Sequence, residues 1–100
     1  MSFKILTIVD AVDLLEANGT QLIDIRDQAA FEAGHIEGAE NVGDHNIDGF
    51  IGSADMDKPL IICCYSGMMS QNAANYFCEQ GFDEVYSLEG GYTAWAAESR

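Results

Sequence analysis

The segment that most restricts the fold is Leu60 to Cys63, four residues that are apolar without interruption and directly follow Pro59. A strand with one face in water alternates apolar and polar residues, whereas a continuous apolar run is typical of a strand covered on both faces. Strands of that kind occur almost only in parallel sheets that carry helices on both sides. This segment therefore predicts an α/β fold.

Three other short apolar segments, residues 3–6, 21–25 and 84–88, are bounded by turn residues and also predict strands. Helical patterns separate them, and right-handed crossovers between parallel strands place helices on both faces of the sheet. We therefore expect a single domain over residues 1–100, with a mainly parallel five-stranded sheet and helices on both faces. The three segments, together with residues 60–64, supply four of these strands.

Between the strands, small and apolar residues recur at the spacing of a helix. The first such helix begins after Thr7, the second spans Ser70 to Glu79 with Gly81 as its C-terminal cap, and a third follows Gly90-Gly91. The segment from Gly43 to Asp57 mixes polar and apolar residues. It predicts one short amphipathic helix within a loop.

Seventeen acidic residues against four basic ones give a formal charge of −13, so nucleic acid and anionic membranes are not expected as partners. One interpretation of this charge is an acidic surface that keeps the protein soluble, and the alternative interpretation is that the surface binds a basic partner. No stretch approaches the roughly 18 consecutive apolar residues of a membrane span, and the first residues lack a signal core. The three cysteines fit no disulfide framework. These features predict a cytoplasmic protein.

Cys64 stands where the central apolar strand ends, and a short loop leads from it to the helix that Ser70 opens. In open parallel sheets, ligands bind beyond the carboxyl ends of the strands. If the loop curls around the sulfur, its backbone N–H groups and the helix N-terminus favour the thiolate, which is the nucleophilic form of cysteine. Cys64 is therefore the candidate nucleophile, although a cysteine at a strand end is more often an inert core residue.

Two stretches of the chain carry a longer pattern. The first is Asp24-Ile25-Arg26 with Phe31, Gly34-His35-Ile36, Gly38-Ala39 and Asn41, and the second runs from Pro59 through the loop 64–69 to Ala73-Ala74, Gly81-Phe82, Val85-Tyr86, Gly90-Gly91 and Trp95. Over almost its whole length the chain resembles the rhodanese homology domain. Within that family it is most similar to the single-domain thiosulfate sulfurtransferases of bacterial glycerol-3-phosphate regulons.

The resemblance implies a rhodanese-like domain that transfers sulfur without a cofactor or metal ion. Thiosulfate would lose its outer sulfur to Cys64, giving a Cys64 persulfide and sulfite, and cyanide or a thiol, including a protein thiol, would then accept the sulfur. The expected substrate-binding residues are those of the loop: Tyr65, Ser66, Gly67, Met68, Met69 and Ser70. None of these side chains is cationic, so we expect thiosulfate to bind weakly.

Five other residues have simpler interpretations. Alternation along the strand turns Cys63 into the core, and Cys78 shares an apolar helical face. The resemblance implies that His35 fastens a loop, while His45 has no partner ligands at metal-binding spacing and is expected at the surface. Arg26 is expected to pair with acidic neighbours or loop carbonyls.

Two rival functions remain at this point. A phosphatase or arsenate reductase of the same fold carries an Arg six positions after its cysteine, where this chain has Ser70. The other rival is a noncatalytic or sulfur-carrier module that binds a partner protein. The sequence leaves the physiological donor, the acceptor and the oligomeric state open.

Overall fold

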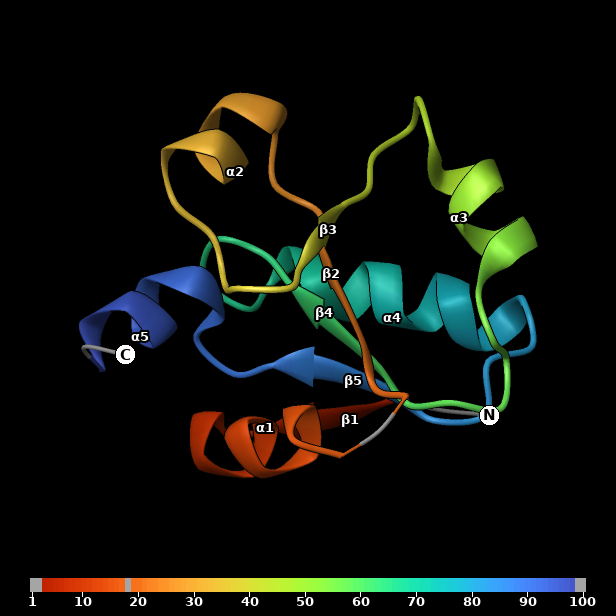
Figure 1. Cartoon of the computed structure of the whole chain (residues 1–100), viewed down its shortest axis with the longest axis horizontal. Helices are drawn as coiled ribbons and strands as arrows, with labels where there is room; N and C mark the ends of the chain where they lie inside the picture. Colours follow the sequence, from red (N-terminus) through yellow and green to blue (C-terminus); the bar gives the residue numbers. More distant parts are fainter. Residues whose placement is uncertain (1–2, 18, 99–100) are drawn as a thin grey trace.

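The computed structural model describes residues 3–17 and 19–98, in which five strands alternate with five helices (Figure 1). Of the expected domain, residues 1, 2, 18, 99 and 100 lie outside the described residues. The strands are β1 (Lys4–Leu6), β2 (Gln21–Asp24), β3 (Glu40–Asn41), β4 (Leu60–Cys63) and β5 (Val85–Leu88). The helices are α1 (Ile8–Leu15), α2 (Gln28–Ala33), α3 (Ile47–Ser53), α4 (Met69–Glu79) and α5 (Gly91–Ala97).

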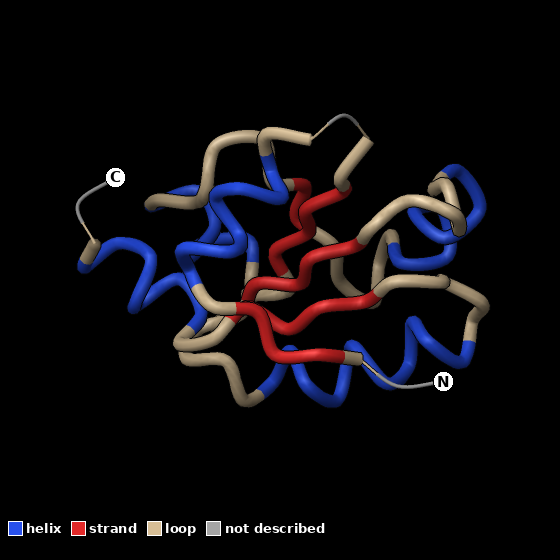
Figure 2. The backbone as a smooth tube through the Cα atoms, turned by 90° about the horizontal axis from the view of Figure 1, so that it is seen from below, coloured by secondary structure: helices blue, strands red, loops and turns tan. Residues whose placement is uncertain are grey.

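The sheet has the order β1-β5-β4-β2-β3, and each neighbouring pair is parallel. Figure 2 shows the strands as a central layer with helices on either side of it. The predicted α/β fold with a parallel five-stranded sheet is confirmed. Every strand points the same way, so their carboxyl ends form one edge, which lies on the left in Figure 1.

Two apolar clusters pack on opposite faces of the sheet, and β4 contributes to both of them. Leu60 and Ile62 belong to the cluster that α3 and α4 cover, whereas Ile61 and Cys63 belong to the cluster that α1 and α5 cover. All four side chains have no exposed surface. Burial on both faces is the physical reason why this segment is apolar without interruption.

The helix predictions agree with the structure to within a residue or two. Thr7 caps α1 by accepting a hydrogen bond from the N–H of Asp10, and α3 lies within the segment predicted to contain a short helix. Helix α4 begins at Met69, one residue before the expected start. Gly81 ends it with a φ of +109° and donates its N–H to the carbonyl of Cys78, which confirms the predicted cap.

The sequence did not locate β3 or α2. Strand β3 has two residues, too few to show any alternation. Helix α2 has six residues and buries none of them, so it shows no apolar stripe. Among the described residues, no helix has the length and apolar character needed to cross a membrane.

Candidate active site

Cys64 immediately follows β4 at the carboxyl edge of the sheet and is fully buried. Its Sγ accepts hydrogen bonds from the backbone N–H of Gly67 at 3.1 Å and of Ser70 at 3.2 Å. The thiol also donates to Ser70 Oγ at 3.3 Å. The loop therefore curls around the sulfur, and two backbone N–H groups converge on it. Such an arrangement stabilises negative charge on the sulfur.

The curl of the loop depends on a glycine. Gly67 has a φ of +94°, which other residues adopt only with strain. A Cβ at this position would lie 2.9 Å from the backbone nitrogen of Gly90, in the turn between β5 and α5. Gly67 thus permits both the turn that aims its N–H at Cys64 and the close approach of the neighbouring turn.

The first turn of α5 holds the other side of the same loop. The N–H groups of Tyr92 and Thr93 donate to the carbonyls of Cys64 at 2.8 Å and Tyr65 at 3.1 Å. Gly91, with a φ of +57°, allows this contact, because a Cβ there would lie 2.5 Å from the Cys64 carbonyl oxygen. These bonds orient the loop carbonyls toward α5, while the loop amides face the sulfur.

Two buried hydroxyl groups lie behind the sulfur. Ser70, in the first turn of α4, and Ser87, on β5, both have no exposed surface, and their Oγ atoms are 2.6 Å apart. Ser70 Oγ is also the acceptor for the Cys64 thiol. Ser70 is therefore a buried partner of the nucleophile, and its side chain is not part of an exposed rim.

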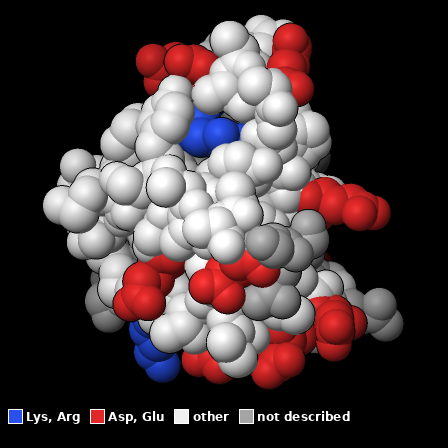
Figure 3. Space-filling model, turned by 90° about the vertical axis from the view of Figure 1, so that its left-hand side faces the viewer, with Lys and Arg blue, Asp and Glu red and all other residues white. Residues whose placement is uncertain are grey.

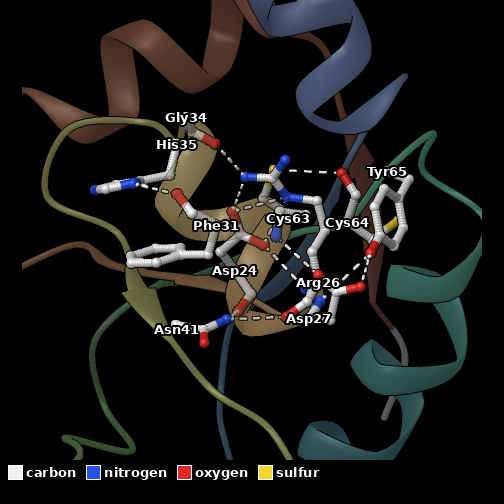
Figure 4. A network of polar contacts seen from close by, with 11 residues as sticks. Asp24, Arg26, Asp27, Phe31, Gly34, His35, Asn41, Cys63, Cys64 and Tyr65 are labelled. Atoms are coloured by element: carbon white, nitrogen blue, oxygen red, sulfur yellow. Dashed lines mark hydrogen bonds and ion pairs between the residues drawn. The ribbon is translucent and has the colours of Figure 1, made fainter.

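A buried ion pair between Asp24 and Arg26 lies beside the loop, with the two charged groups 2.7 Å apart (Figure 4). Arg26 also donates to the Gly34 carbonyl at 2.7 Å and stacks 4.3 Å from the centre of the Tyr92 ring. Its hydrogen bonds with Asp24 are the largest of the effects that raise the pKa of Arg26. The predicted pairing with an acidic neighbour and a loop carbonyl is confirmed.

Cys63 and Cys78 are buried as predicted. Burial raises the pKa of the Cys63 thiol to about 12, and the nearby Asp24 carboxylate acts in the same direction. Burial also raises the pKa of Cys78. Both thiols are therefore held in their un-ionised and unreactive form at neutral pH.

The remaining loop side chains face outward. Met68 and Met69 are 70% and 51% exposed, and Ser66 is exposed as well. Tyr65 extends to Asp27 at the start of α2, and its hydroxyl donates a hydrogen bond to Asp27 Oδ2 at 2.9 Å (Figure 4). The backbone N–H of Ala30, followed by the Tyr65 hydroxyl, lowers the pKa of Asp27. Of the seven predicted site residues, the structure brings Cys64, Gly67 and Ser70 together at the sulfur and leaves four around the loop's exterior.

Acidic side chains outnumber basic ones around the loop. Figure 3 shows the face that carries the carboxyl ends of the strands: most of it is uncharged, its acidic side chains lie mainly toward the upper and lower parts, and a basic side chain is visible in a hollow between them. A cavity of about 630 Å³ beside Tyr65 and Met69 is bordered by Asp27 and Asp44. Arg26 also borders it, but this cation is already paired with Asp24. An anion that enters this cavity therefore meets two carboxylates and a cation whose charge is already compensated.

Neither histidine is hydrogen-bonded to Cys64 Sγ, although His45 borders the cavity beside the loop. His35 shares a 2.7 Å hydrogen bond with the Phe31 carbonyl and stacks on the Phe31 ring at 3.8 Å, so it fastens the end of α2 (Figure 4). His45 is exposed, as expected. Within residues 3–17 and 19–98, no group of three His, Cys, Asp or Glu side chains could hold a metal ion.

Comparisons with known proteins agree with this geometry. A family model of the rhodanese-like domain matches residues 7–98. The chain belongs to the rhodanese-like family. A relative from Shewanella oneidensis named thiosulfate sulfurtransferase GlpE is 55% identical over 94 residues, covering 94% of this rhodanese-like chain and 93% of the relative. A protein of the same name from Pseudoalteromonas translucida is 46% identical, with 97% and 92% covered.

Among solved structures, the rhodanese-like chain is similar to a Rhodopseudomonas palustris protein of unknown function described as a possible tyrosine phosphatase. The TM-score is 0.83 at 28% identity, with 97% of this chain and 82% of the other covered. That description concerns the neighbour. In this rhodanese-like chain, the position six residues after the nucleophile is Ser70, whose side chain is buried against Cys64.

Sequence reasoning missed two parts of this rhodanese-like site. Ser87 gave no signal, because a serine between Tyr86 and Leu88 is compatible with an exposed position on a strand. The pair Gly90-Gly91 marked the start of a helix, but its contact with the Cys64 carbonyl depends on how the β5–α5 turn packs against the loop. Only the folded chain shows that contact.

Proposed function

We propose that this protein is a thiosulfate sulfurtransferase in which Cys64 carries the transferred sulfur as a persulfide. The observation that carries the proposal is the convergence of the Gly67 and Ser70 N–H groups on Cys64 Sγ. The relatives named thiosulfate sulfurtransferase supply the donor class. The loop contacts explain how a buried cysteine can carry negative charge in this fold.

In the first step, the Cys64 thiolate attacks the outer sulfur of thiosulfate. A bond forms between Sγ and that sulfur, the bond between the two thiosulfate sulfurs breaks, and sulfite leaves with the bonding electron pair. In the second step, an acceptor such as cyanide attacks the outer sulfur of the persulfide, and the Cys64 thiolate leaves. Cys64 is thus the nucleophile of the first step and the leaving group of the second.

The loop residues divide between two roles in this proposal. Gly67 and Ser70 hold Sγ, while Tyr65, Ser66, Met68 and Met69 surround the approach to it. The loop has no cationic side chain that could bind thiosulfate, so backbone amides and hydroxyl groups bind it. Mass spectrometry of the protein before and after thiosulfate tests the proposal. One added sulfur mapped to Cys64 supports it, and an unmodified Cys64 under turnover conditions contradicts it.

A protein thiol is the second acceptor class that we propose. Two methionines at 70% and 51% exposure flank the approach to Cys64, and flexible thioether side chains are suited to contact with a protein surface. Three free, buried thiols are compatible with a reducing compartment such as the cytoplasm, where we propose that the protein acts. The phosphatase alternative lacks its oxyanion-binding Arg, since Ser70 occupies that position.

Position 66 offers a test of how the site binds thiosulfate. We expect Ser66→Lys to lower the KM for thiosulfate severalfold at low ionic strength, because it places a cation beside a dianion in an acidic environment. Ser66→Glu is the matched control and should raise the KM. Steady-state kinetics at two salt concentrations provide the measurement, and salt should reduce both differences. If neither variant changes KM, the side chain at position 66 does not face the donor.

A further inference from the structure

Three side chains from different parts of the chain form a short buried chain of hydrogen bonds. The Oγ of Ser87, on β5, lies 2.6 Å from the Oγ of Ser70 at the start of α4, and Ser70 Oγ lies 3.3 Å from the Sγ of Cys64, which directly follows β4. None of the three residues has exposed surface. We propose that Ser87 is a positioning residue that acts through Ser70 to stabilise negative charge on Cys64 Sγ. This inference rests on the proposed function of Cys64.

The direction of the hydrogen bonds supports this role. While Cys64 is a thiol, its S–H donates to Ser70 Oγ, and either Ser70 or Ser87 can be the donor in the bond between the two hydroxyls. Once the thiol has lost its proton, a second direction opens, in which Ser87 donates to Ser70 and Ser70 donates to the sulfur, so that each hydroxyl hydrogen has an acceptor. A buried donor without an acceptor is costly, so the thiolate favours the second direction.

The second direction requires a sulfur atom that accepts. In it, Cys64 Sγ accepts from the N–H groups of Gly67 and Ser70, as in the structure, and would also accept from the Ser70 hydroxyl, whose oxygen lies 3.3 Å away. Three donors on one sulfur match the thiolate and not the thiol. Ser87 therefore favours the anionic form without touching the sulfur, because it fixes which way the Ser70 hydroxyl points.

This arrangement affects the two half-reactions differently. Sγ carries negative charge in the free thiolate, whereas in the persulfide the charge moves to the outer sulfur. When the acceptor attacks, the charge returns to Sγ as it leaves, and a better stabilised thiolate leaves faster. Ser87 should therefore increase the fraction of thiolate at neutral pH and accelerate discharge of the persulfide.

The test uses Ser87→Ala and two measurements that report on Cys64. The first is the pH dependence of inactivation by iodoacetamide, whose midpoint should rise by about half a pH unit. The second is single-turnover discharge of preloaded persulfide by cyanide, which should slow about threefold. In a Ser70→Ala background, Ser87→Ala should change neither quantity, because the connection to the sulfur is already removed.

Two comparisons separate this role from a purely structural one. Ser53→Ala removes an exposed hydroxyl from α3 and should change neither measurement. Ser87→Thr and Ser87→Val introduce side chains of similar shape, and only the Thr side chain has a hydroxyl. If Ser87→Ala does not fold, the two measurements are repeated on this pair. Ser87→Val should then show the raised alkylation midpoint and the slower discharge, and Ser87→Thr should resemble the wild type.

The proposal is overturned if Ser87→Ala loses stability but keeps the wild-type midpoint and discharge rate, or if its effects persist unchanged in the Ser70→Ala background. The proposed function fails by a different result. In that case the wild type forms no persulfide from thiosulfate, although the alkylation midpoint still depends on Ser87.

Discussion

Cys64→Ser abolishes sulfur transfer from thiosulfate to cyanide, lowering the rate by more than about a thousandfold. The serine hydroxyl remains un-ionised at neutral pH, and the groups that hydrogen-bond to the side chain at position 64 are the Gly67 and Ser70 amides and the Ser70 hydroxyl, none of which is a general base. The substitution is nearly isosteric and keeps the buried contacts, so the fold is expected to persist. Thiocyanate formation measures the activity, and circular dichroism checks the fold.

Cys78→Ser is the control for this experiment, because Cys78 lies near the C-terminal end of α4, where it faces the apolar cluster and is away from the loop. It should lose some stability, since a hydroxyl replaces a buried thiol, and retain sulfur transfer. Thiocyanate production by Cys64→Ser at the wild-type rate, or loss of activity in a folded Cys78→Ser, would mean that the sulfur is carried by a different residue.

Gly91→Ala is expected to lower sulfur transfer by more than about tenfold, because its Cβ would collide with the backbone that carries Cys64. The new atom would lie 2.5 Å from the Cys64 carbonyl oxygen and 2.7 Å from the Tyr65 carbonyl oxygen. The loop must then move away from α5. Displacement of the loop backbone shifts the Gly67 and Ser70 amides relative to the sulfur, and steady-state kinetics report the loss.

Gly38→Ala is the matched control for Gly91→Ala. Gly38 also has a positive φ, +89°, but a Cβ there would meet no atom within 4 Å. Both variants carry the backbone strain of a left-handed alanine, which costs about 1 kcal/mol of stability. Only Gly91→Ala adds the collision. Equal losses of activity in the two variants would show that the contact between α5 and the loop is not what positions Cys64.

The sequence predicts those parts of the molecule that local patterns determine. The uninterrupted apolar run at β4 is typical of a strand buried on both faces, and such a strand places Cys64 at the carboxyl edge of a parallel sheet. The curl of the loop follows from its length and from Gly67. The two-residue strand β3 and the exposed helix α2 leave no pattern, because neither buries a periodic face.

The roles of Ser87 and Gly91 could not be predicted from local sequence patterns. Their roles come from contacts between segments that are more than fifteen residues apart, Ser87 with Ser70 and Gly91 with Cys64. A serine in a short strand and a glycine before a helix have the same local appearance with or without these contacts. Their functions depend on the packing of β5 and α5 against the loop, which no local periodicity encodes.

The order of the strands also has a consequence for protein synthesis. The last strand of the chain, β5, lies between the first strand, β1, and the strand that carries the nucleophile, β4. Because a chain leaves the ribosome from its N-terminus, β1 and β4 emerge with their shared neighbour still missing. Helix α5, which holds the carbonyls of Cys64 and Tyr65, emerges later still. A nascent chain therefore completes its reactive thiol site only after β5 and α5 have both been released.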